Sequence, residues 1–198
     1  MKRILWMAVL TLALPMAAFA NNVDFTNSGG TLTGSSAGLS LTGSELIAVN
    51  GFQGGGLVVG DLGTVSFSTG AITSGNLQTG ATFASGGSFV INSTALGTLF
   101  NGSFTCIDSC TWVLTTLANG THNYTFTGAL QGTYYNGSTV FGATVQLTIN
   151  TGKGYFNGST QISSGDTNIS TVPEPGSLTL LGTGLVGMAG ALRRKLKA

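Results

Sequence analysis

Residues 21–171 contain no proline and no sustained apolar periodicity of 3.6 residues, which argues against a domain built from amphipathic helices. Short segments rich in Thr, Val, Phe, Ile and Tyr alternate instead with Gly, Asn and Ser, and Gly supplies 32 of the 198 residues. β-Branched and aromatic residues favour strands, whereas glycine and asparagine favour the tight turns between them. The middle of the chain is therefore predicted to be an all-β domain.

Strands and turns can be placed along this domain. The predicted strands cover residues 46–49, 64–68, 88–92, 111–118, 121–135 and 138–150. Five Asn-Gly pairs begin at Asn50, Asn101, Asn119, Asn136 and Asn157. Asn-Gly is typical of the type I′ turn of a two-residue hairpin loop, so several of these pairs are predicted to connect antiparallel neighbours.

The third and fourth Asn-Gly pairs make a joint prediction of register. A two-residue loop at the third pair places Val113 opposite Phe126, and one at the fourth pair places Phe126 opposite Leu147. Both arrangements put the apolar residues of the three strands on one face. Because a slip of one residue would invert that face, the agreement predicts a three-stranded antiparallel meander over residues 111–150.

A sheet with one apolar face needs a second layer to cover it, and the upstream strands are available for that layer. The predicted fold is therefore an antiparallel β-sandwich of jelly-roll or immunoglobulin-like type. A β-solenoid is the alternative, since low charge and abundant Gly, Thr and Asn also suit it, although no fixed repeat of 20 to 30 residues supports it.

Charge is unevenly placed along the chain. The formal net charge is +1, but between residues 21 and 171 five acidic residues face a single lysine, a balance of 1 − 5 = −4. The residues concerned are Asp24, Glu45, Asp61, Asp108 and Asp166, with Lys153. A nucleic-acid binder needs clustered Lys and Arg to replace phosphate counterions, so that class is excluded for this domain.

The N-terminus has the three parts of a secretory signal peptide. Lys2 and Arg3 open the chain, a largely apolar run covers 4–19, and small residues end it, with cleavage expected between Ala20 and Asn21. A short buried helix or a retained membrane anchor is the alternative. Cleavage would leave a mature chain that begins outside the cytoplasm.

The C-terminus repeats this order in reverse. It consists of Val172-Pro173-Glu174-Pro175, an apolar run over 176–192, and the basic residues Arg193, Arg194 and Lys195 within a basic tail, 193–198. At about 1.5 Å per helical residue the apolar run reaches about 26 Å, slightly less than a hydrocarbon core of about 30 Å. It is predicted to be a transmembrane helix with the basic tail on the cytoplasmic side. A buried C-terminal helix of the domain is the alternative.

This tail resembles the PEP-CTERM sorting signal of Gram-negative bacteria over roughly the last 27 residues. The resemblance implies insertion in the inner membrane, processing near Pro173-Glu174-Pro175 by an exosortase, which is a membrane-embedded cysteine protease, and delivery to the cell surface or an exopolysaccharide matrix. The chain is then predicted to comprise a signal peptide, 1–20, an extracytoplasmic β domain, 21–171, and a sorting signal, 172–198.

Cys106 and Cys110 are the only cysteines, and export places them in an oxidising compartment. They are a candidate disulfide that closes a tight loop and stiffens it locally. The spacing is not the C-x-x-C of redox proteins, and two Cys with one His are too few ligands for zinc.

Little in the sequence suggests catalysis, a cofactor or a metal. His122, the only histidine, is predicted to be a half-buried structural residue opposite Leu117, and the acidic residues are scattered singly. Residues 165–168, Gly-Asp-Thr-Asn, are predicted to form a turn, with a calcium loop as the alternative. Aromatic residues near turns are candidates for stacking on sugar rings; they are Tyr134, Tyr135, Tyr155 and Phe156.

These observations rank three functions. The first is a non-catalytic exported protein of the cell surface or the exopolysaccharide and biofilm matrix. The second is a carbohydrate-binding or calcium-binding module, and the third is an extracellular hydrolase. They can be separated by whether polar side chains converge on the folded domain.

Overall fold

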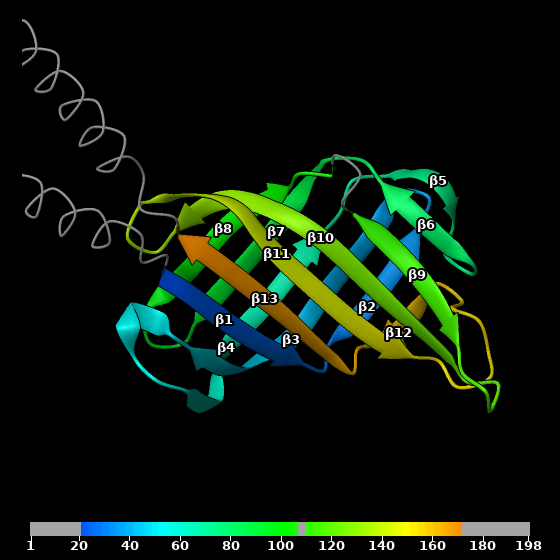
Figure 1. Ribbon diagram of the computed structural model, residues 1–198, viewed down its shortest axis with the longest axis horizontal. Helices are drawn as coiled ribbons and strands as arrows, with labels where there is room; N and C mark the ends of the chain where they lie inside the picture. The colour runs from blue at the N-terminus through cyan, green and yellow to red at the C-terminus, as the bar shows by residue number, and fades with distance from the viewer. Residues whose placement is uncertain (1–20, 107–109, 172–198) are drawn as a thin grey trace, which may run out of the picture. The chain divides into compact units, whose positions relative to one another are not determined.

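Strands make up most of the chain that the computed structural model describes, which is residues 21–106 and 110–171 (Figure 1). The strands are β1 (Asn21–Ser28), β2 (Thr31–Ser35), β3 (Gly38–Asn50), β4 (Val58–Ser68), β5 (Ile72–Asn76), β6 (Gly80–Phe83), β7 (Gly86–Ser93), β8 (Gly97–Phe104), β9 (Thr111–Thr116), β10 (His122–Tyr134), β11 (Thr139–Asn150), β12 (Ser159–Gln161) and β13 (Ser164–Thr171). A short 3-10 helix, η2 (Phe52–Gly54), lies between β3 and β4. Residues Asn22–Ser170 form one compact unit.

Eight of these strands form a closed antiparallel barrel. Neighbours around it are β1, β3, β4, β7, β8, β10, β11 and β13, and β13 is hydrogen-bonded back to β1. The predicted β-sandwich is therefore wrong, and the β-solenoid alternative is wrong as well. One sheet curls until its first and last strands pair, so its apolar face is covered by the opposite wall of the same sheet and no second sheet is needed.

The remaining strands extend the barrel at one end. β10 is long enough to share one edge between two partners: Leu130–Tyr134 pair with β8, and His122–Thr127 pair with β9. β9 continues through β6 to β5, while β2 pairs with β3 and with β12. In Figure 1 the strands β5, β6, β9 and β12 lie at the right of the barrel.

The predicted meander is present as β9, β10 and β11, but its first hairpin has a different register. Phe126 lies opposite Trp112 and not Val113. The Leu117 N–H donates to the Thr121 carbonyl, so the loop has three residues, with Gly120 at a φ of 79°. A three-residue loop shifts the pairing by one position, which turns Trp112 into the core and leaves Val113 exposed.

In the second hairpin the predicted register is confirmed, since Phe126 lies opposite Leu147. This loop also has three residues, because the Tyr134 N–H donates to the Ser138 carbonyl. A bulge near Gly142, whose φ is 81°, then inserts one extra residue into β11. The loop and the bulge shift the pairing in opposite directions, so the register expected from a two-residue loop is restored.

Aromatic rings fill the barrel. Phe67, Phe89, Phe104 and Phe126 pack with neighbouring ring centroids 5.6 to 6.0 Å apart, and all four are buried. Offset and edge-to-face ring pairs at such distances stabilise a core beyond the area they bury. The interior is therefore a packed core, and a binding site has to be sought on the outside.

Several predictions fall outside the described residues. These are the signal peptide 1–20 with its cleavage after Ala20, and the sorting signal 172–198 with its predicted transmembrane helix over 176–192. Among residues 21–106 and 110–171, no helix has the length and apolar character needed to cross a membrane.

Candidate functional site

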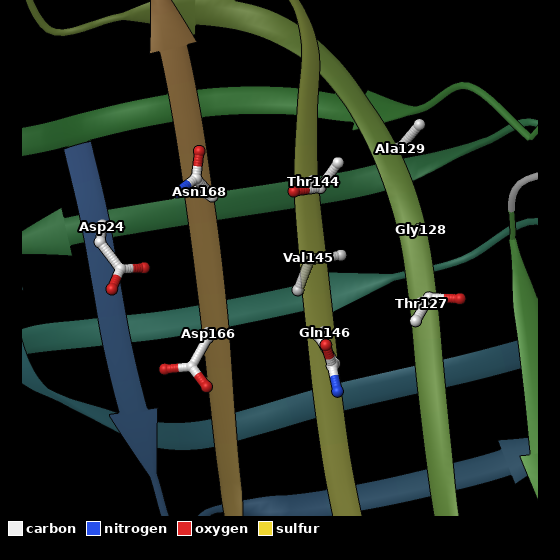
Figure 2. Close-up of a pocket in the computed structure, with 9 residues that line it drawn as sticks. All are labelled: Asp24, Thr127, Gly128, Ala129, Thr144, Val145, Gln146, Asp166 and Asn168. Carbon is white, nitrogen blue, oxygen red and sulfur yellow. The ribbon is translucent and has the colours of Figure 1, made fainter. Parts of the chain in front are cut away.

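A hollow of about 410 Å³ lies on the outer face of the barrel, over β10, β11, β13 and β1 (Figure 2). The residues that line it are Asp24, Thr127, Gly128, Ala129, Thr144, Val145, Gln146, Asp166 and Asn168. Carboxylate, amide and hydroxyl groups all occur in it, from strands that are far apart in the sequence. No single sequence motif contains this group of residues.

The strand register aligns these side chains in rows across the barrel. Thr127 lies opposite Gln146, and Gln146 lies opposite Asp166. Alternate residues of a strand point to the same face, so Thr144 and Asn168 form the next outward row. The side chains contributed by β10 are small, which leaves room beside the longer side chains of β11 and β13.

The hollow is acidic. Asp24 of β1 and Asp166 of β13 lie on neighbouring strands, and none of the nine lining residues is basic. Partial burial, and secondly the negative charge of Asp166, raise the pKa of the Asp24 carboxyl above its usual value. The hollow therefore disfavours anions and suits groups that donate hydrogen bonds.

A second hollow, of about 500 Å³, lies between β2, β5 and the loop before β12. Its lining is uncharged and includes Ser35, Ser36, Asn76, Gln78 and Asn157. The Asn76 side-chain oxygen accepts hydrogen bonds from the backbone N–H groups of Gln78 and Thr79, so it is already used to hold its own turn. The acidic hollow is the better candidate for a site.

The structure revises the prediction for residues 165–168. They lie inside β13 and do not form a turn. The extended backbone points Asp166 and Asn168 outward and Gly165 and Thr167 inward, so the four residues do not wrap around a cation. Within the described part of the chain no group of three or more His, Cys, Asp or Glu side chains is placed to hold a metal ion.

Of the acidic residues that appear scattered in the sequence, Asp24 and Asp166 are brought together by the pairing of β1 with β13. Sequence reasoning missed Asp24, Thr144 and Gln146 as site residues. The alternation of polar and apolar residues identifies Thr144 and Gln146 as outward-facing, but only the closure of the barrel brings them near Asp24.

His122 packs against the loop between β11 and β12. It is buried, its Nδ1 lies 3.2 Å from the Gly154 carbonyl oxygen, and its ring stacks on Tyr155 with centroids 4.4 Å apart. Its partner across the hairpin is Thr116 and not the predicted Leu117, again because the loop has three residues. These contacts hold the loop between β11 and β12.

The four candidate stacking aromatics do not form one platform. Tyr134 and Phe156 are buried in the core, whereas Tyr135 and Tyr155 are exposed. Tyr135 follows β10 and Tyr155 packs beside His122, the first residue of that strand, so the two exposed rings lie at opposite ends of β10. A shared sugar-stacking surface made of these residues is therefore excluded.

Cys106 and Cys110 are joined in a disulfide. The bond links the chain just after β8 to the residue before β9, and Cys110 is buried. The Cys106 N–H also donates to the Ser85 hydroxyl at 2.8 Å. Both cysteines are thus held against the body of the barrel.

Comparison with known families gives a match at the end of the chain. A family described as the PEP-CTERM protein-sorting motif matches residues 171–195. The chain carries a PEP-CTERM sorting signal. The match contains Val172, Pro173, Glu174 and Pro175 and the basic residues Arg193, Arg194 and Lys195, so the predicted resemblance of the tail to a PEP-CTERM sorting signal is confirmed.

The PEP-CTERM signal marks the protein for export and processing by an exosortase, with the cell surface as its destination. Apart from Thr171, the last residue of β13, the matched residues follow the strands of the barrel in the sequence, so the match does not indicate what the barrel does. A comparison with curated proteins finds no match for the chain.

Proposed function

We propose that the mature protein is a non-catalytic component of the extracellular polysaccharide matrix, and that it binds neutral, hydroxyl-rich sugar chains at the acidic hollow. In this proposal the segment 176–192 holds the precursor in the inner membrane until an exosortase separates the barrel from its tail. The observation that carries the proposal is the hollow itself, a group of carboxylate, amide and hydroxyl side chains on the outside of an exported domain.

The chemistry of the hollow suits such a ligand. The carboxylates of Asp24 and Asp166 accept hydrogen bonds from sugar hydroxyls, while the amides of Gln146 and Asn168 both donate and accept. A charged acceptor forms a stronger hydrogen bond than a neutral one. The absence of a basic residue among the lining side chains favours neutral over anionic polysaccharides.

The test is retention of the mature protein by polysaccharide purified from the matrix of the producing bacterium. The variant Asp166→Asn with Asn168→Ala changes two outward side chains of the hollow. We expect it to lose at least about five-fold in affinity, since each hydrogen bond to a charged group contributes roughly 1.5–3 kcal/mol before non-additivity is counted.

Glu45→Gln is the matched control, because Glu45 is an exposed acidic residue of β3 outside the hollow. This control should bind like the wild type. Equal retention of all three proteins would contradict binding at the hollow, and no retention of the wild type under any condition would contradict the matrix function.

A further inference from the structure

Exposed apolar side chains gather at one end of the barrel, on or beside the turns β3–β4 (51–57), β7–β8 (94–96) and β10–β11 (135–138). The exposed fraction is 65% for Leu57, 55% for Val58, 67% for Val59, 60% for Leu96 and 61% for Phe141. We call these five residues the apolar rim. No residue of the three turns carries a charge. Grouped apolar side chains of this kind mark a surface that meets an apolar partner.

The turns that carry the rim are tied to one another. The rings of Phe52 and Tyr135 lie with centroids 4.8 Å apart, which joins the β3–β4 connection to the β10–β11 turn. The Tyr135 N–H donates to the Leu99 carbonyl of β8 at 2.8 Å, and the Thr94 N–H donates to the Leu62 carbonyl of β4 at 3.0 Å. The turns therefore present one end surface held together by the barrel.

Both ends of the described domain lie at this same end of the barrel. Asp24 pairs with Asn50, so β1 begins beside the β3–β4 connection. The Ser170 hydroxyl lies 3.3 Å from the Asn22 side-chain oxygen, so the last residues of β13 lie beside the first residues of β1. Figure 1 shows the start of β1, the arrowhead of β13 and the β3–β4 connection at the left.

The length of the chain beyond β13 limits how far this end is from the membrane. Only residues 172–175 separate Thr171 from the predicted membrane segment 176–192. Five residue steps span at most about 17 Å when fully extended. On the outer side of the bilayer, the polar headgroup region takes up about 5–8 Å of that distance.

We propose that in the membrane-inserted precursor the barrel stands end-on against the bilayer, with the apolar rim in the headgroup region of the outer face of the inner membrane. This inference rests on the membrane insertion assumed in the proposed function. The short tether brings the end surface to the lipid, and the exposed Leu, Val and Phe side chains gain by leaving water there.

The contact is apolar in origin and temporary. The domain carries five acidic residues against one lysine, so anionic lipids do not attract it. A few exposed side chains bind lipid weakly without a covalent anchor. Processing near Pro173-Glu174-Pro175 removes the tether, and the barrel then leaves the membrane.

The test uses the full-length chain in vesicles of neutral phosphatidylcholine. The two cysteines of the sequence, Cys106 and Cys110, are joined in a disulfide. A single introduced cysteine is therefore the only thiol that a fluorophore can label. Val58→Cys reports on the apolar rim. Val113→Cys is the control, because it is similarly exposed, at 51%, but lies on β9, which pairs with the other half of β10.

We expect nitroxide-labelled lipid headgroups to quench the fluorophore at position 58 at least about three-fold more than the one at position 113. Carbonate extraction measures insertion of the tail separately. Retention of the protein in the membrane with equal quenching at both positions would overturn the docking proposal while leaving insertion intact. Extraction of the protein would overturn the insertion assumed in the proposed function, and docking with it. The fluorophore at position 58 could instead be quenched by a nitroxide-labelled second copy of the protein and not by lipid. That result would assign the apolar rim to self-association and overturn the proposed docking on the membrane.

Discussion

The pair Asp24 and Asp166 is the strongest electrostatic feature of the outer hollow. Their strands are neighbours only because the barrel closes between β13 and β1. Burial and the charge of Asp166 both disfavour ionisation of Asp24, and its pKa is raised. A carboxyl group that is harder to ionise in the folded state binds its proton more tightly there than in the unfolded chain. Ionised Asp24 therefore lowers the stability of the fold.

Asp24→Asn should accordingly raise the melting temperature at pH 7 by a small amount, since Asp24 is only partly buried. The gain should shrink as the pH falls through the raised pKa, and disappear below the usual value of 3.8, where Asp24 is protonated in both states. Thermal unfolding between pH 3 and pH 7 measures this. Asp61→Asn removes an exposed charge outside the hollow, and an identical pH profile for both variants would show that net charge alone is responsible.

At the scale of elements, turn chemistry is predictable from the sequence to within one residue. Asn-Gly at 119 and 136 correctly marks two turns, but both loops have three residues and not two. The difference inverted the predicted face of β9, whereas the bulge at Gly142 corrected that of β11. The length of a hairpin loop and the position of a bulge both depend on pairing across strands. Neither the inverted face of β9 nor the restored face of β11 can therefore be read from the local sequence.

Close contact between β8 and β10 depends on paired glycines. Gly132 lies opposite Gly102, and a Cβ at Gly132 would overlap the Asn101 carbonyl oxygen and the Gly102 Cα. Gly132→Ala should therefore lower the free energy of unfolding by about 1–3 kcal/mol, as overpacking does in other cores. Denaturant unfolding measures the change.

Gly56→Ala serves as the control for Gly132→Ala. A Cβ at Gly56 meets no atom within 4 Å, and the residue has no positive φ. This variant should retain the wild-type stability or gain slightly, because alanine restricts the unfolded chain. A Gly132→Ala protein as stable as Gly56→Ala would mean that β8 and β10 are not in the close contact described.

At the scale of the whole molecule, the all-β class and the β9–β10–β11 order are predictable, but the closed barrel is not. Closure depends on β13 pairing with β1, the two ends of the described unit, and no local pattern reports a contact of that range. The same contact creates the acidic hollow. The sorting signal is different, because its residues are consecutive and are recognised as a sequence.

The central claim is that the barrel is a separate domain, that the PEP-CTERM tail directs it to the cell surface, and that the tail is removed on the way. The most direct test is the intact mass of the protein recovered from the surface of the producing bacterium, alongside a variant with Pro173, Glu174 and Pro175 changed to alanine. We predict a surface protein that begins at Asn21 and lacks residues 176–198, and a variant that stays in the membrane with its tail. A surface protein that retains the tail, or a variant that matures like the wild type, would contradict the account.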